Sequence, residues 1–334
     1  MTDTKGQGKP LASPGDEAHE LGPESVGLKG VLSHRPKPYG LAEATHLIGD
    51  DFGYANTSAQ AVHPVDKPLS SSFFEETATW SKAQAREYLS THAHPGEPIE
   101  TVLHDGRDFL GGINKHALAV DGLRREIDRL YLRFHCIKFE VCRITGLPSD
   151  AKLDFDMNAN GDKRLTKLLG KLRLLTKQIA GLKVLRRGHY RSVDGIKKSW
   201  FGWLANRGVE LALRYRAAVV VEDLTLVAKE KGAPEYMGRT FNKMTNNGSV
   251  GQYRRASSQK LKWYGIPEVR VPSYYTSSTD IRHGVVDKKQ RKSQDRFVAH
   301  RDGKVWQADL HAATTIALYP LLRPIQAGNQ HLVV

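Results

Sequence analysis

The stretch Ala-Ala-Val-Val-Val-Glu-Asp-Leu, residues 217–224, decides the fold class of this chain. Its five small or β-branched apolar residues run without alternation, a pattern typical of a strand buried on both faces of an α/β sheet. Two carboxylates follow at once, so Glu222 lies at the C-terminal end of that strand. Ligands and catalytic groups gather at this edge of open α/β sheets, which makes Glu222 a candidate site residue. From this stretch alone, a strand that ends in ordinary solvated acids is the alternative.

Two further segments place carboxylates at the ends of predicted elements. Residues 45–58 indicate a short apolar strand that runs into Asp50 and Asp51, although a strand followed by Asp-x-Gly also opens ordinary hairpins. Asp309 stands at the start of an apolar helix, where it either caps the helix or binds metal. Three carboxylates from separated segments are what a two-metal phosphodiesterase needs, because Mg²⁺ and Mn²⁺ prefer hard oxygen ligands.

The composition indicates a polyanionic partner. The 334 residues include 50 Lys and Arg against 36 Asp and Glu, which gives a formal net charge of +14 and a pI near 9.6. Nucleic acid is the simplest such partner. Cys136 and Cys142 are the only cysteines, which excludes a disulfide framework and a thiolate zinc site and indicates a cytoplasmic protein. No apolar run approaches the roughly 18 residues of a membrane span, so no membrane partner is expected.

Residues 115–216 are predicted to form a helical insertion. Apolar residues at alternating spacings of four and three indicate two helices that pack as an antiparallel hairpin. These residues are Leu123, Ile127, Leu130, Phe134, Ile137, Val141 and Ile144 in the first helix and Leu165, Leu168, Leu172, Leu175, Ile179 and Leu182 in the second. Gly146 ends the first helix, Asp121 is interpreted as its N-cap, and a further helix is expected over residues 190–216.

The helical insertion holds much of the excess charge. Residues 161–216 contain 15 Lys and Arg but only three acids, and one sign alone repels itself unless phosphates compensate it. We therefore predict a nucleic-acid groove here. Its expected contact residues are Lys183, Arg186, Arg187, Arg191, Lys197 and Lys198. The nearby Trp200, Phe201 and Trp203 are interpreted as core contacts, with base stacking as the alternative.

An ordered set of motifs extends over about residues 216–318. The set comprises Val-Val-Val-Glu-Asp-Leu, then Lys260-Leu-Lys-Trp-Tyr-Gly-Ile, Val269-Arg-Val-Pro, Tyr275-Thr-Ser, and Asp302-Gly followed after four residues by Ala-Asp-Leu-His-Ala-Ala. It resembles the C-terminal half of TnpB-type transposon-associated proteins and of the type V CRISPR effector nucleases. The resemblance implies a RuvC-like, RNase H-type nuclease domain whose second and third acids are Glu222 and Asp309. Its first acid lies in Gly-Ile-Asp-x-Gly, and the similar residues 49–53 assign that role to Asp51.

The sequence departs from this family in two places. The family has a cysteine-rich zinc ribbon before its third acid, and the matching positions here are Asp280, His283, Ala299 and Asp302. We therefore expect a degenerate ribbon-like hairpin over about residues 276–304 that holds no structural zinc and that, with its many Lys and Arg, binds the target nucleic acid directly. The family also has guide-RNA-binding domains ahead of its first acid, where this chain has only some 45 mostly polar residues. A guide RNA, and a partner protein that replaces those domains, are left open.

The sequence thus predicts a disordered tail over residues 1–40, a RuvC-like α/β nuclease domain over 41–318 and a C-terminal tail over 319–334. We expect a DNA endonuclease that holds two Mg²⁺ or Mn²⁺ ions on Asp51, Glu222 and Asp309. One alternative is a DNA-binding repressor of the same family that no longer cuts. Another is an unguided, structure-specific junction nuclease.

Overall fold

The computed structural model describes residues 37–53, 56–155, 161–224 and 250–325. The predicted N-terminal tail falls outside these ranges up to residue 36, and so do residues 326–334 of the predicted C-terminal tail. None of the helices in the described part combines the length and hydropathy that a membrane span requires.

A mixed five-stranded sheet with the order β4-β2-β1-β5-β6 forms the centre of the domain. The strands are β1 (His46–Asp51), β2 (Asn56–Pro64), β4 (Glu100–Asp105), β5 (Ala217–Asp223) and β6 (Glu268–Pro272). Strands β1, β5 and β6 run parallel, whereas β2 is antiparallel to both of its neighbours. The three parallel strands therefore end at the same edge of the sheet.

Strand β5 lies inside the sheet, between β1 and β6, and every residue of its apolar run is buried. This confirms the prediction from the uninterrupted run. Gly49 of β1 allows a helix to approach closely, because a Cβ built on it would lie only 1.9 Å from the carbonyl oxygen of Ala313. Ala313 belongs to α8 (Ala308–Leu318), a helix whose side chains are nearly all buried.

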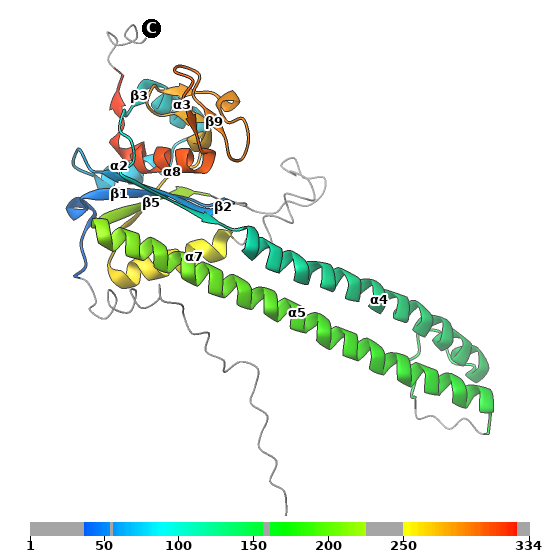
Figure 1. Cartoon of the computed structure of the whole chain (residues 1–334). Helices are drawn as coiled ribbons and strands as arrows, with labels where there is room; N and C mark the ends of the chain where they lie inside the picture. Colours follow the sequence, from blue (N-terminus) through cyan, green and yellow to red (C-terminus); the bar gives the residue numbers. More distant parts are fainter. Residues whose placement is uncertain (1–36, 54–55, 156–160, 225–249, 326–334) are drawn as a thin grey trace, which may run out of the picture.

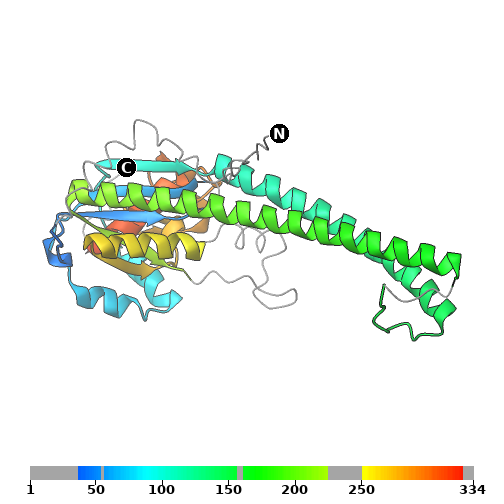
Figure 2. The ribbon, with the colours of Figure 1, turned by 90° about the horizontal axis from the view of Figure 1, so that it is seen from below.

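Helices cover both faces of the sheet (Figure 1). Helix α8 packs on one face, against β1 and β2. Helix α7 (Val250–Tyr264) and the C-terminal part of α5 (Lys163–Tyr215) cross the other face, as the view from below shows (Figure 2). The predicted α/β fold class, with a long helical insertion and a ribbon-like hairpin, is confirmed.

The helical insertion is an arm of two antiparallel helices, α4 (Arg107–Thr145) and α5, that projects from the sheet (Figures 1 and 2). Helix α4 ends before Gly146, whose φ of 72° is left-handed, as predicted. The N-cap assignment of Asp121 is wrong, because α4 begins 14 residues earlier. Gly111 and Gly112 do not break the helix there, since Phe109 and its neighbours pack against α5.

The prediction of a separate helix over residues 190–216 is also wrong, because α5 is one continuous helix of 53 residues. Gly181, Gly188 and Gly195 lie inside it, each at a cost of roughly 1 kcal/mol relative to Ala, yet no proline interrupts it. Asp162 caps its first turn by accepting hydrogen bonds from two backbone amides. The arm therefore connects to β5 without a break.

Shorter elements complete the domain. They are η1 (Leu41–Glu43), α2 (Ser71–Thr77), α3 (Lys82–Thr91), β3 (His92–Ala93), η2 (Thr276–Ser278), β7 (Thr279–Asp280), β8 (Val285–Val286), η3 (Lys288–Gln290), β9 (Phe297–Val298), β10 (Val305–Trp306), η4 (Tyr319–Leu321) and β11 (Arg323–Pro324). The predicted ribbon consists of two short antiparallel pairs, β7 with β8 and β9 with β10. The predicted domain end at residue 318 is too early, because Tyr319 is fully buried and β11 pairs with β3.

Candidate active site at the carboxyl edge of the sheet

Asp51, Glu222 and Asp309, here called the edge acids, come from three elements that meet at one edge of the sheet. Asp50 of β1 pairs with Val221 of β5, so Asp51 and Glu222 each lie one position further along parallel strands. They therefore point to the same face of the sheet. Asp309 comes from the first turn of α8, which packs on that face.

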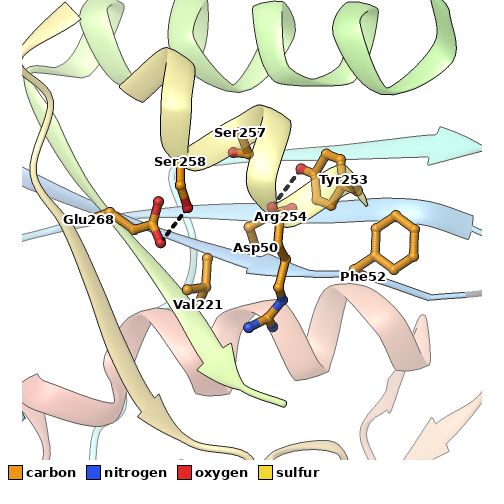
Figure 3. Close-up of a pocket in the computed structure, with 8 residues that line it drawn as sticks. All are labelled: Asp50, Phe52, Val221, Tyr253, Arg254, Ser257, Ser258 and Glu268. Carbon is orange, nitrogen blue, oxygen red and sulfur yellow. Dashed lines mark hydrogen bonds between the residues drawn. The ribbon is translucent and has the colours of Figure 1, made fainter. Parts of the chain in front are cut away.

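Strand alternation separates Asp51 from its neighbour Asp50. Gly49 faces α8, and Asp51, two residues further on, shares that face, while Asp50 points to the opposite one. There Asp50 accepts hydrogen bonds from the Tyr253 hydroxyl at 2.6 Å and from Ser58 Oγ at 2.7 Å. Figure 3 shows the bond between Asp50 and Tyr253 of α7. The structure thus brings Asp51, and not Asp50, together with the other two acids.

The edge acids carry more negative charge than their surroundings compensate. Burial, followed by the charges of Glu222 and Asp309, raises the pKa of Asp51 well above its usual range. Burial also raises the pKa of Glu222, against the opposing effects of the Thr276 hydroxyl and of Arg254 and Arg291. Three carboxylates that meet at one edge, two of them with raised pKa values, are a donor set that fits Mg²⁺ or Mn²⁺.

Three residues at this site were given no role from the sequence. Thr276 donates a hydrogen bond to a carboxylate oxygen of Glu222, and Tyr275, just before it, has a φ of 64° that is uncommon outside glycine. Arg291 donates to Asp309 Oδ1 at 2.7 Å. The third residue, Arg254, donates to the backbone oxygen of Glu222. Of these three residues, only Thr276 could have been found from the sequence, because it belongs to the Tyr-Thr-Ser motif.

The cluster of Asp280, Arg282, His283 and Asp302, here called the ribbon cluster, occupies the expected degenerate zinc positions. Within the described ranges, Asp280, His283 and Asp302 are the only three potential metal ligands whose donor atoms all lie within 4.8 Å of one another. Arg282 meets both carboxylates, with Nη1 2.7 Å from Asp302 Oδ2 and Nε 3.4 Å from Asp280 Oδ1. The remaining position, Ala299, is buried and offers no ligand.

His283 completes the ribbon cluster, with Nδ1 2.7 Å from Asp280 Oδ2. Asp280 is fully buried, and each of its carboxylate oxygens has a partner within the chain: Oδ1 lies near Arg282 and Oδ2 near His283. The hydrogen bond from Arg282 lowers the pKa of Asp302 to about 2. Arg282 thus compensates part of the negative charge of this cluster.

The six predicted nucleic-acid contacts divide into two groups. Arg187, Arg191 and Lys198 are exposed on α5. The other three, Lys183, Arg186 and Lys197, are half-buried or buried. The ammonium of Lys183 donates to the hydroxyl of Tyr131 on α4 at 2.7 Å. Lys197 is only 8% exposed, which corrects the prediction that it contacts nucleic acid.

Comparison with known proteins finds likeness among solved structures. No family model matches the sequence, and no curated protein matches it. The chain is similar to CasPhi-2 (Cas12j) bound to crRNA, with a TM-score of 0.42, 14% sequence identity, and coverage of 88% of this chain and 50% of that chain. It is also similar to Cas12f1 in a complex with sgRNA and target DNA, with a TM-score of 0.39, 14% identity, and coverage of 84% and 51%.

A further similar structure is Alicyclobacillus acidoterrestris C2c1 in complex with single-guide RNA. Its TM-score is 0.36 at 10% identity, with coverage of 86% of this chain and 41% of that chain. These proteins are type V effectors, the group that the sequence motifs resemble. The chain spans about half of their length or less.

Proposed function

We propose that this chain is a metal-dependent DNA endonuclease in which the edge acids hold two Mg²⁺ or Mn²⁺ ions. The observation that supports this most directly is the convergence of three carboxylates from β1, β5 and α8 at one edge of the sheet. Burial and the two neighbouring charges raise the pKa of Asp51, so the site gains when cations compensate that charge. The motif resemblance assigns the same three acids.

The reaction is the hydrolysis of a phosphodiester. The edge acids would hold the divalent cations, which would supply an activated water and compensate charge on the leaving oxygen. The water releases one proton to solvent as its oxygen forms a bond to phosphorus, the bond from phosphorus to the leaving sugar oxygen breaks, and that oxygen takes a proton from solvent to become a hydroxyl. Within the chain, the edge acids stay ionised to hold the cations, and Thr276 keeps Glu222 in one orientation.

A cleavage assay with two matched variants tests the enzyme. Glu222→Gln keeps the shape of the side chain but removes its charge, so cleavage in Mg²⁺ or Mn²⁺ is lost while DNA binding persists. Asp223→Asn is the control, because Asp223 is exposed and follows Glu222 directly. Equal loss in both variants contradicts the assignment. Wild-type protein that binds DNA but cuts none, with or without its co-purified RNA, supports the repressor instead, and cleavage of junctions alone supports the junction nuclease.

We assign the contacts to the nucleic-acid backbone to the exposed Arg187, Arg191 and Lys198 of α5. Each change to Gln is expected to flatten the salt dependence of DNA binding by about 0.7 to 0.9 units, whatever the DNA sequence. Lys183→Gln is the control, because the ammonium of Lys183 bonds to Tyr131. Unchanged slopes in all three variants would show that this face is only solvated.

The proposal also extends to two binding partners, a guide RNA and a partner protein. The net charge of +14 and the motif resemblance support an RNA partner. Sequencing of the RNA that stays bound through a high-salt wash tests this: one enriched species supports a guide, whereas a random mixture contradicts it. A protein that co-purifies in a fixed ratio is the corresponding test for the partner.

A further inference from the structure

Arg254 reaches the edge acids from the face of the sheet that lies opposite α8. Figure 3 shows its side chain pointing away from α7, with the guanidinium beside the end of β5. One nitrogen donates to the backbone oxygen of Glu222, and the charge of Arg254 lowers the pKa of the Glu222 carboxyl against the effect of burial. The guanidinium therefore lies within electrostatic reach of the acids.

Arg254 has little else to bind among the residues that the structure describes. In the described ranges, the Glu222 carbonyl is its only hydrogen-bond partner, and no carboxylate forms an ion pair with it. A guanidinium offers five N–H donors, so most of them are unused. Arg291 differs, because it is already paired with the carboxylate of Asp309. A half-buried cation with unused donors is suited to an anion from outside the chain.

A buried network holds Arg254 in this place. The preceding residue, Tyr253, is 2% exposed, donates its hydroxyl to Asp50 at 2.6 Å and stacks on Phe52 with ring centroids 4.7 Å apart. Asp50 in turn accepts a hydrogen bond from Ser58 of β2. The first turn of α7 is thereby fastened to the end of β1, the strand that also carries Asp51.

We propose that Arg254 binds a non-bridging oxygen of the scissile phosphate, with Tyr253 and Asp50 as positioning residues. This rests on the proposed function of the edge acids. Cations held by those acids repel a neighbouring guanidinium, and a phosphate that enters between them offsets the repulsion. Planar guanidinium donors also match the geometry of phosphate oxygens better than an ammonium does. Arg254 thus contributes to substrate binding once cations and phosphate are both present.

The test compares Arg254→Gln and Arg254→Lys with Arg255→Gln, an exposed neighbour on the same helix. Three quantities are measured: Mn²⁺ binding without DNA, the salt dependence of binding a short single-stranded DNA in Ca²⁺, and the single-turnover cleavage rate. Arg254→Gln is expected to retain Mn²⁺, to flatten the salt slope by about 0.7 units and to lower the rate about 10²-fold. Arg254→Lys restores the slope but only part of the rate, and Arg255→Gln matches wild type.

The outcomes separate this proposal from the proposed function. If wild-type protein cuts no DNA, yet Arg254→Gln still flattens the salt slope, the nuclease proposal fails and the phosphate contact stands. An unchanged slope together with a lower melting temperature would show that Arg254 only holds the Glu222 carbonyl, which overturns the contact. Equal effects in Arg255→Gln overturn it as well. Tyr253→Phe keeps the ring packing but loses the bond to Asp50, and it should lower the rate less than Arg254→Gln does.

Discussion

The edge acids and the ribbon cluster differ in what compensates their charge. In the ribbon cluster, Arg282 lies between Asp280 and Asp302, and the pKa of Asp302 falls to about 2. At the sheet edge, the pKa of Asp51 and that of Glu222 are both raised. The ribbon cluster has the closer donor atoms, yet Arg282 lies between its two carboxylates and the pKa of Asp302 is low. The raised pKa values of Asp51 and Glu222, rather than the proximity of carboxylates, distinguish the sheet edge as the candidate cation site.

The largest expected difference between the two groups lies in cleavage. Asp309→Asn removes an oxygen ligand with its charge, and it should lower metal-dependent cleavage by at least about 10³-fold, the scale of losing a catalytic group. Asp302→Asn leaves the edge acids untouched and should change the rate less than about twofold. Rates measured at saturating Mn²⁺ decide the matter. Equal losses would mean that the ribbon cluster also belongs to the active site.

Removal of the compensating arginine should destabilise the ribbon cluster. Arg282→Ala removes the guanidinium that pairs with the fully buried Asp280 and leaves His283 as the remaining side-chain partner of that carboxylate. We expect the free energy of unfolding to fall by about 3 kcal/mol, the lower end for breaking a buried pair, since His283 remains. Urea denaturation monitored by tryptophan fluorescence measures it. A loss below about 1 kcal/mol would show that the charge of Asp280 is compensated in another way.

Neutralising an edge acid should have the opposite effect and stabilise the metal-free protein. Because the pKa of Asp51 is raised on folding, the folded state binds more protons than the unfolded state, and stability falls as the pH rises through that window. In EDTA at about pH 7.5, Asp51→Asn should therefore melt a few degrees higher than wild type. At about pH 4 the gain should shrink, because Asp51 is then protonated in the folded protein.

Added Mn²⁺ supplies the control for the Asp51 prediction. A cation that binds the folded state stabilises wild-type protein more than Asp51→Asn, which lacks one ligand. The order of melting temperatures should therefore reverse between EDTA and Mn²⁺. A variant that melts lower than wild type in EDTA would contradict the view that the edge acids repel one another.

The smallest expected effect concerns zinc in the ribbon cluster. A structural zinc site needs a closed shell of four ligands, whereas this cluster offers Asp280, His283 and Asp302, with an arginine among them. Protein purified without added metal should contain far less than one zinc per chain, and His283→Ala should not change that value. Elemental analysis that finds about one zinc per chain, lost in His283→Ala, would reverse the distinction between the two groups.

Part of this site was predictable from the sequence for a physical reason. The unbroken apolar run of β5 is typical of a strand covered on both faces, so the position of Glu222 followed from it. From the sequence it is harder to say which of Asp50 and Asp51 lies with the other acids. Successive strand residues face opposite sides of the sheet, and only the contact of Gly49 with α8 shows that Asp51 is the one on that helix's side. The motif favours Asp51, and the structure places Asp51 with the other acids.

The compensating groups were not predictable in this way. Arg254 and Thr276 lie 32 and 54 residues beyond Glu222, and no local pattern relates them to it. Arg282 stands between two predicted positions, but its inward direction depends on how the short β7 and β8 strands turn. The start of α4 at Arg107 was missed because Asp121 was interpreted as the N-cap, whereas the residues before it pack against α5 and extend the helix.

Helix α5 is continuous, so its length determines how far the arm extends from the sheet. A helix of 53 residues is about 80 Å long, which is a little more than two turns of B-form DNA. Only Arg216, in the left-handed region, separates the end of this helix from the start of β5, the strand that carries Glu222. Under the proposed function, a duplex bound along the arm would be cut at a distance that the length of the helix sets, and lengthening the arm by whole turns should move the cut by the same distance.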